Sequence, residues 1–190
     1  MNIFYKENET FDKIDFSANA FEPIEYENCN FIQCNFGGVN LSRSKFENCT
    51  FDTCNLSMVK LADTVFSSCK FKNSKLLGVH FEDCNSFGFS VVFQNCILSH
   101  SSFYKCKLKR NVFTECQLEE VDFTEADLSF ASFIDCDLKN AKFERSLLEK
   151  CDFRKAKNYL FRLDQNKVKG AKFCLPEVLK LFSVYAIDVE

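Results

Sequence analysis

The stretch Cys29-Asn30-Phe31-Ile32-Gln33-Cys34-Asn35-Phe36 decides the fold, because one pattern of five residues occurs in it twice. A large apolar residue stands at Phe31 and Phe36, and a small cysteine precedes each by two positions. Residues two apart in an extended chain point to the same face. A helix cannot keep this pattern on one face, since a period of five drifts around a turn of about 3.6 residues. Each pentapeptide is therefore predicted to be a short extended segment with one large and one small side chain inward.

The same pattern runs along most of the chain. With one exception, a large apolar residue occupies every fifth position from Phe11 to Phe81 and again from Phe93 to Phe173. We call these positions slots. Of the 32 slots, 18 are Phe, 11 are Leu, one is Tyr and one is Val, and only Asn158 is polar. Internal repetition at a fixed period is the sequence signature of a solenoid.

Sampling every fourth slot shows how many sides each coil has. With an offset of two positions in the middle, one such column contains only phenylalanine: Phe11, Phe31, Phe51, Phe71, Phe93, Phe113, Phe133, Phe153 and Phe173. Sampling every third slot mixes residue types. Four pentapeptides, one for each side, therefore make one coil, and about eight coils make a rod roughly 40 Å long at the ~4.8 Å spacing of strands.

The offset lies in residues 82–92, where two extra residues are predicted to form a local bulge on one side of one coil. Whether Phe87 or Phe89 points inward is left open by the sequence. Two interpretations of the bulge also remain: a tolerated insertion, or a protruding loop that contacts a partner.

The order of a small residue, a polar residue, Leu or Phe, and two more polar or small residues resembles the pentapeptide-repeat family, from roughly Thr10 to Lys172. This resemblance implies an all-β, right-handed, quadrilateral parallel β-helix. Gly is frequent at the family's corners, and the second position after a slot is here Gly in three places and often Asn. Asn tolerates positive φ better than most residues do. The corner residues in question are Gly38, Gly78, Gly170, Asn28, Asn48, Asn73, Asn95 and Asn140.

The chain is divided into residues 1–174, the predicted solenoid, and 175–190, a short C-terminal α-helix with a tail. Pro176 suits the first position of a helix, and the open end of a solenoid needs a cover. Val178, Leu179, Phe182 and Tyr185 form an apolar stripe at α-helical spacing. The apolar residues exceed what one cap requires and predict a homodimer through this end. The candidate cap and dimer residues are Val178, Leu179, Leu181, Phe182 and Tyr185.

Twelve cysteines raise the question of disulfides or metal, but eleven of them lie two positions before a slot, where they serve as small core residues. We expect no cofactor and no metal. Neither histidine lies beside a nucleophile in a known motif, and a filled prism offers no cleft, so catalysis is not expected. No apolar run approaches the ~20 residues of a membrane helix, and the N-terminus does not resemble a signal peptide. We expect a cytoplasmic protein with no membrane contact.

Charge gives one local feature. The net charge of −3 does not indicate direct nucleic-acid binding. A stretch of about one coil carries eight acidic residues and no Lys or Arg, and basic residues flank it on both sides. It is either a solvated belt or a contact surface, which we call the acidic belt: Glu115, Glu119, Glu120, Asp122, Glu125, Asp127, Asp135 and Asp137.

Within the family, a final coil followed by a short apolar helix and a hydrophobic tail is similar to the fluoroquinolone-resistance (Qnr and MfpA) and microcin-immunity members. Cys54-Asn55-Leu56-Ser57-Met58 also resembles a segment common in Qnr proteins. This resemblance implies a dimeric rod that imitates duplex DNA, binds DNA gyrase or topoisomerase IV and confers quinolone or toxin resistance. That function is the alternative to our first expectation, a non-enzymatic scaffold for an unidentified protein partner.

Overall fold

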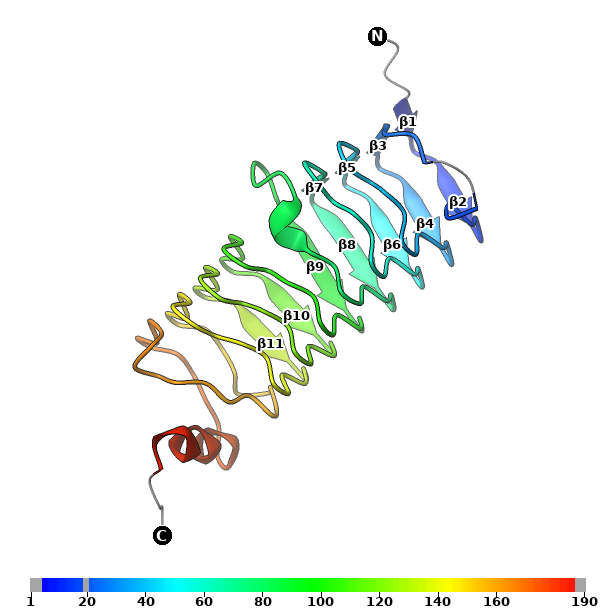
Figure 1. Cartoon of the computed structure of the whole chain (residues 1–190). Coiled ribbons are helices and arrows are strands. Elements are labelled where there is room, and N and C mark those ends of the chain that lie inside the picture. The colour runs from blue at the N-terminus through cyan, green and yellow to red at the C-terminus, as the bar shows by residue number, and fades with distance from the viewer. Residues whose placement is uncertain (1–4, 19–20, 187–190) are drawn as a thin grey trace.

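The structure is a computed structural model, and it describes residues 5–18 and 21–186. The chain forms a rod of stacked coils, with the N-terminal strands at one end and a helix at the other (Figure 1). All strand pairs are parallel, and before the bulge the partners lie four pentapeptides apart, as in Tyr5↔Glu25 and Phe11↔Phe31. The predicted four-sided coil is confirmed.

Two parallel sheets lie on two sides of the rod. The four-stranded sheet has the order β1-β3-β5-β7, and the seven-stranded sheet has the order β11-β10-β9-β8-β6-β4-β2. The first consists of β1 (Tyr5–Glu7), β3 (Glu25–Glu27), β5 (Lys45–Glu47) and β7 (Val65–Ser67). The second consists of β2 (Thr10–Asp12), β4 (Asn30–Ile32), β6 (Thr50–Asp52), β8 (Cys69–Lys72), β9 (Val91–Gln94), β10 (Val112–Thr114) and β11 (Ser132–Ile134).

The number of coils follows from the larger sheet. Its seven strands span six turns, and the bridges Ser132↔Asp152 and Asp152↔Lys172 continue the same side for two more, which makes the eight coils expected. Isolated parallel bridges such as Asn35↔Asn55 and Ser102↔Asp122 hold the remaining sides together.

Stacked aromatic rings fill the interior. In the all-phenylalanine column, successive ring centroids lie 4.8–5.5 Å apart with nearly parallel planes. Rings of neighbouring sides meet edge to face, as Phe113 and Phe123 do at 5.9 Å. Both arrangements suit the quadrupole of an aromatic ring. The column is buried from Phe31 to Phe153.

The cysteines fill the space beside the rings. All twelve are free thiols, and eleven are buried. Many of their Sγ atoms donate to backbone carbonyls, as Cys49 does to the oxygens of Tyr26 at 3.5 Å and Glu47 at 3.4 Å. The thiol therefore acts as a compact hydrophobic group whose weak donor is satisfied by nearby backbone.

The corners adopt the left-handed conformation. The glycines and asparagines predicted there have φ between 50° and 73°. Bulkier residues adopt it too, including Arg43 (φ 65°) and Phe130 (φ 62°). Most corner N–H groups donate to a carbonyl of the next coil, as Arg43 N does to the oxygen of Ala62 at 3.0 Å. The turn geometry, repeated along the rod, thus overrides the preference of the individual residue.

Asn158 is a slot that the structure does not use. Its side chain is exposed at a positive φ of 60°, and Tyr159 and Phe161 fill the interior instead, at 0% and 5% exposure. Outside the core, the Nδ2 of Asn158 donates to Asp137 at 2.8 Å, and its backbone N–H donates to Glu177 at 2.9 Å. A buried amide would lose these hydrogen bonds. The five-residue register is therefore interrupted here as well.

At the bulge, the offset between paired strands grows by two positions, as Cys69↔Val91 and Phe71↔Phe93 show. A short 3-10 helix, η1 (Phe81–Asp83), begins the irregular segment. Phe89 points inward, because its ring lies 6.3 Å from that of Phe81, whereas Phe87 is 90% exposed.

The C-terminal helix is a 3-10 helix, η2 (Glu177–Tyr185), so the expectation of an α-helix is wrong. Three residues per turn bring Leu181 beneath Val178. Leu181 is fully buried and Leu179 is 41% exposed, so Leu179 of the predicted stripe faces outward, whereas Val178 packs against the core as expected.

Tyr185 ties this helix to the rod. Its hydroxyl accepts from the backbone N–H of Leu163 at 2.7 Å and donates to the carboxylate of Asp164 at 2.8 Å. The tail beyond Ala186 lies outside the described residues. No helix in the described part of the chain is long and apolar enough to span a membrane.

Candidate functional site

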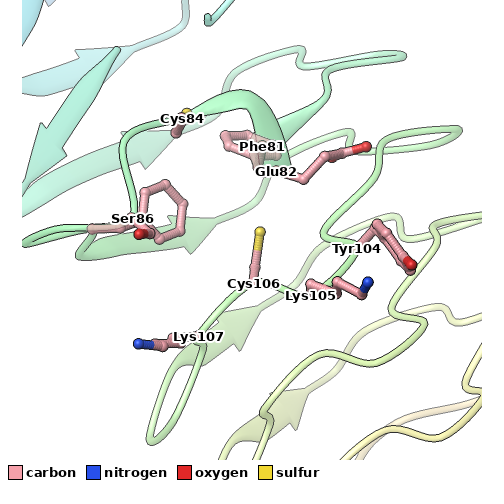
Figure 2. A pocket seen from close by; sticks show the side chains of 9 residues that line it. Phe81, Glu82, Cys84, Ser86, Tyr104, Lys105, Cys106 and Lys107 are labelled. Atoms are coloured by element: carbon pink, nitrogen blue, oxygen red, sulfur yellow. The ribbon is translucent and has the colours of Figure 1, made fainter. Parts of the chain in front are cut away.

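A pocket of about 390 Å³ opens at the bulge (Figure 2). The slot five positions after Phe81 is Ser86, so the large inward side chain of this side is missing from one coil. Phe89 replaces it only in part, because it is still partly exposed and lines the pocket. The expectation that a filled prism offers no cleft is therefore wrong at this place. The central lining residues are Phe81, Cys84, Phe89, Tyr104 and Cys106.

The pocket reaches the interior of the rod. Cys84 and Cys106 are each 9% exposed, whereas the other buried cysteines are at most 2% exposed. Burial raises the pKa of the Cys106 thiol to about 12, with a further contribution from the carboxylate of Glu82. Burial is also the main cause that raises the pKa of Cys84. Both thiols are thus protonated at neutral pH and form an apolar wall rather than a nucleophile.

Charged groups surround the mouth of the pocket. The Oε1 of Glu82 lies 3.1 Å from the Nδ1 of His80, and its Oε2 is buried with no hydrogen-bond partner in the described structure. Lys105 lies 4.8 Å above the ring of Tyr104 and 3.6 Å from the carboxylate of Glu125. One carboxylate oxygen of a lining residue, the Glu82 Oε2, is thus shielded and lacks a donor in the described structure.

The acidic belt is more neutral than its sequence indicates. Cations from adjacent coils approach its carboxylates: Lys139 lies 2.7 Å from Glu119, Arg145 3.0 Å from Glu125 and Lys157 3.7 Å from Asp137. His100 faces Glu120 at 3.2 Å. The Oδ1 atoms of Asp122 and Asp127 accept backbone N–H groups two positions later. Among the described residues, only Glu115 and Asp135 of the belt form neither kind of contact.

A basic surface that crosses the coil of the acidic belt was missed in the sequence. Its centre is Phe130, which is 42% exposed and lies within 5.0 Å of the Lys150 Nζ, 5.3 Å of the Arg110 Cζ and 5.9 Å of the Lys109 Nζ. The bridges Lys107↔Asp127 and Asp127↔Leu147 keep successive coils twenty residues apart in register, which places Arg110, Phe130 and Lys150 at the same corner of three coils. The sequence could have revealed this surface through the cations that recur on the same side from one coil to the next. The net charge of the chain does not show them.

The structure gives no indication of a metal centre. In the described ranges, no group of three or more His, Cys, Asp or Glu side chains is arranged to hold an ion. The acidic belt and the C-terminal residues remain candidate contact surfaces. The pocket at the bulge is lined in part by the thiols of Cys84 and Cys106.

A family model described as "pentapeptide repeat region" matches residues 7–86 and 89–158. The chain belongs to the pentapeptide repeat family. Its two matched blocks meet at the bulge. No curated protein matches the sequence of this pentapeptide repeat protein.

Among solved structures, the chain is similar to QnrB1, a plasmid-mediated fluoroquinolone resistance protein. The two are 18% identical, the alignment covers 97% of this chain and 100% of QnrB1, and the TM-score is 0.53. It is also similar to HetL of the cyanobacterium Nostoc sp. strain PCC 7120, a pentapeptide repeat protein involved in heterocyst differentiation regulation. HetL is 14% identical, with 88% and 84% coverage and a TM-score of 0.47. At these identities, the likeness shows the fold alone.

Proposed function

We propose that this pentapeptide repeat protein is a non-enzymatic scaffold that binds a protein partner through its outer surface. The observation that carries the proposal is the bulge, where a regular rod exposes an aromatic side chain, Phe87, beside an apolar pocket. Large aromatic residues are enriched at protein interfaces and supply much of their binding energy. Along the regular coils, by contrast, the aromatic slot residues are packed in the core from Phe31 to Phe153.

Affinity capture with quantitative mass spectrometry tests this proposal. The wild-type chain and Phe87→Ser are immobilised at equal density and exposed to lysate from the source cells. The proposal expects proteins that the wild type retains and Phe87→Ser retains at least several-fold less. Equal retention by both chains, or no specific retention by either, contradicts it. Matching circular dichroism spectra show that the exposed substitution leaves the fold unchanged.

The acidic belt allows a second surface to be tested in the same assay. Glu119→Lys together with Glu120→Lys reverses two exposed charges and breaks the pair with Lys139. Exposed ion pairs contribute little to stability, so the fold is expected to remain intact. Unchanged partner retention would make the belt ordinary solvated surface.

The alternative is a DNA mimic that binds DNA gyrase or topoisomerase IV and confers quinolone or toxin resistance. It is supported by the resemblance of the C-terminal segment to Qnr-type members and by a fold that matches QnrB1 along its whole length. The ion pairs of the acidic belt and the basic surface around Phe130 weigh against it, because a DNA mimic needs an extended negative face. Gyrase supercoiling assays with and without a quinolone test it. Neither inhibition nor protection at tens of micromolar protein would exclude it.

We further propose a homodimer through the C-terminal end. Leu175 is 73% exposed and Leu179 is 41% exposed on the segment that covers the last coil, so an apolar surface remains after capping. A mass measurement in solution distinguishes monomer from dimer.

A further inference from the structure

The basic surface around Phe130 extends over four successive coils on one side of the rod. Parallel bridges hold one outward row of this side in register: Lys107↔Asp127, Asp127↔Leu147 and Leu147↔Lys167. Backbone hydrogen bonds from each coil to the next hold the adjoining corner row, which consists of Arg110, Phe130, Lys150 and Gly170. Six cations lie in these rows or between them, and all six are exposed: Lys107, Lys109, Arg110, Lys150, Lys167 and Lys169.

These cations have no ion-pair partner in the part of the chain that the structure describes. Elsewhere on the rod, a cation one coil away from a carboxylate pairs with it, as Lys139 does with Glu119 at 2.7 Å. Residues 107–110, 127–130, 147–150 and 167–170 contain the six cations and two carboxylates, Asp127 and Glu149, so their summed charge is +4. The chain as a whole has a net charge of −3. A negatively charged partner would supply the groups that these cations lack.

The centre of the basic surface is apolar. Phe130 is 42% exposed, and its φ of 62° lies in the left-handed region that a bulky residue rarely adopts. Leu147, in the outward row, is also partly exposed. An apolar centre within a polar rim is the usual anatomy of a protein interface. The partner should therefore carry an apolar group as well as negative charge.

The ring of Phe130 is occupied by cations from the two neighbouring coils. The Cζ of Arg110 lies 5.3 Å from the ring centroid, and the Nζ of Lys150 lies 5.0 Å from it. The quadrupole of the ring attracts both cations and holds them in place. A nucleic-acid base that stacked on this ring would have to compete with them. The arrangement therefore favours carboxylates, which bind the cations directly, over stacked nucleotides.

The length of the basic surface suits a short extended polypeptide. Lys107 and Lys167 are three coils apart, which is about 14 Å at the ~4.8 Å spacing of strands. In an extended chain, residues i, i+2 and i+4 face the same way and span about 13 Å. Acidic residues at the two ends of such a segment can meet the outer cations while an apolar residue between them lies on Phe130 and Leu147.

We propose that the basic surface binds an acidic segment of the protein partner, in which carboxylates flank an apolar residue. The inference deepens the proposed scaffold function, because it states the chemistry of the partner, and it rests on that proposal for the existence of the partner. Complementary charge on two such surfaces speeds association and selects the correct partner.

The probe is the peptide acetyl-Glu-Glu-Thr-Leu-Thr-Glu-Glu-amide, labelled with tetramethylrhodamine and titrated with the full chain at low ionic strength. Fluorescence anisotropy is expected to show saturable binding in the range of tens to hundreds of micromolar. Added salt should weaken the binding, because it screens exposed charges. The same peptide with Gln in place of every Glu is expected to bind at least tenfold more weakly. Absence of saturable binding, or equal binding of the two peptides, overturns the proposal.

Two double variants that remove the same charge locate the binding. Arg110→Gln with Lys150→Gln removes the cations beside Phe130 and is expected to weaken binding at least fivefold. Lys13→Gln with Lys60→Gln is the matched control, because both lysines are exposed in the N-terminal half and form no ion pair with a described residue. The control is expected to bind as wild type does, and equal weakening by the two double variants overturns the site.

Two further arms keep the result decisive. If the variant at positions 110 and 150 loses the native circular dichroism spectrum, Lys107→Gln with Lys167→Gln takes its place and is expected to weaken binding at least fivefold. A single-stranded oligothymidylate of the same charge as the acidic peptide is expected to bind more weakly than the peptide. Tighter binding of the oligothymidylate that is lost with the two cations would overturn the polypeptide partner in favour of a nucleic acid.

The titration requires no natural partner, so its failure is distinguishable from that of the scaffold proposal. In the affinity capture, retention of the partner at the wild-type level by Arg110→Gln with Lys150→Gln overturns this inference and leaves the scaffold proposal standing. Failure of every chain to capture a partner overturns the scaffold proposal, and the titration still decides whether the basic surface binds an acidic segment.

Discussion

Alkaline pH should unfold this protein in a narrow range, because its core contains many buried thiols. Burial is the main cause that raises the pKa of most of these cysteines; for Cys96 and Cys116, a hydrogen bond to the neighbouring thiol comes first. Nine cysteines have a raised pKa: Cys29, Cys34, Cys54, Cys69, Cys84, Cys96, Cys106, Cys116 and Cys151. Each is at most 9% exposed.

The sign follows from proton linkage. A cysteine in an unfolded chain loses its proton near pH 8.5, whereas these thiols keep theirs in the folded rod. Their stabilisation is fully present below that pH and is lost as the pH rises toward the folded pKa values. At pH 9.5 each thiol whose folded pKa lies far above that pH costs about 1.4 kcal/mol, so the six most strongly shifted thiols (Cys54, Cys84, Cys96, Cys106, Cys116 and Cys151) together cost on the order of 8 kcal/mol. That is comparable to the whole stability of a typical domain, about 5–15 kcal/mol. Cys49 acts in the opposite sense, because a hydrogen bond to Cys69 lowers its pKa.

Urea unfolding at pH 7, 8.5 and 9.5, in the presence of a phosphine reductant and followed by circular dichroism, measures this loss. Thiolate absorbance recorded in parallel should rise together with the loss of the native spectrum. Cys116→Val is the matched variant, and its pH dependence should be shallower by about 1.4 kcal/mol per pH unit above pH 9. An unfolding free energy that stays constant to within about 1 kcal/mol up to pH 9.5 would refute the reasoning.

Three further predictions concern the ends and the core of the rod. The Arg162 guanidinium, together with the Tyr185 hydroxyl, lowers the pKa of Asp164 to about 2. The stabilisation that this carboxylate gives the cap is therefore present above pH 4 and is lost as the pH falls toward 2. Hydrogen exchange of the C-terminal helix, measured across this pH range, checks the prediction. Leu179→Asp should convert a dimer to a monomer in sedimentation without a change in circular dichroism, and an unchanged mass would remove the proposed interface. Phe113→Ala should lower the unfolding free energy by about 3–5 kcal/mol, because its ring is stacked on both sides, and a loss below about 1 kcal/mol would contradict the packing described.

The repeating part of the fold was predictable because equivalent residues occupy the same structural position in every coil. A phenylalanine at Phe113 or Phe133 is inward for the same geometric reason, so counting four pentapeptides at a time is enough to place both. The buried cysteines followed from the same counting. The corner conformation was also predictable where Gly or Asn marks it, although residues such as Phe130 adopt it with no signal of their own.

The places that differ are those where local alternatives compete. Asn158 is aligned with the slots, but Tyr159 is the better inward residue, and a polar side chain gains hydrogen bonds by turning out. At Ser86 the column of slots loses its large residue, and counting alone did not show that a pocket results. The 3-10 helix could not be distinguished from an α-helix, because Val178, Leu181 and Phe182 fit either period in so short a segment.

The charged surfaces show a different limit of prediction from the sequence. Glu119 and Lys139 lie one coil apart, so a stretch that looks purely acidic in the sequence is paired with the next coil. Reading charge by column rather than by segment would have found both this neutralisation and the cations around Phe130.

The most direct test of the scaffold proposal is site-specific photo-crosslinking at position 87. A benzoylphenylalanine replaces Phe87, and the same group at Gln94, an exposed position on the regular β9, serves as the control. The proposal predicts a discrete crosslinked partner from position 87 that is absent from position 94. No crosslinked protein from position 87, or the same products from both positions, would contradict it.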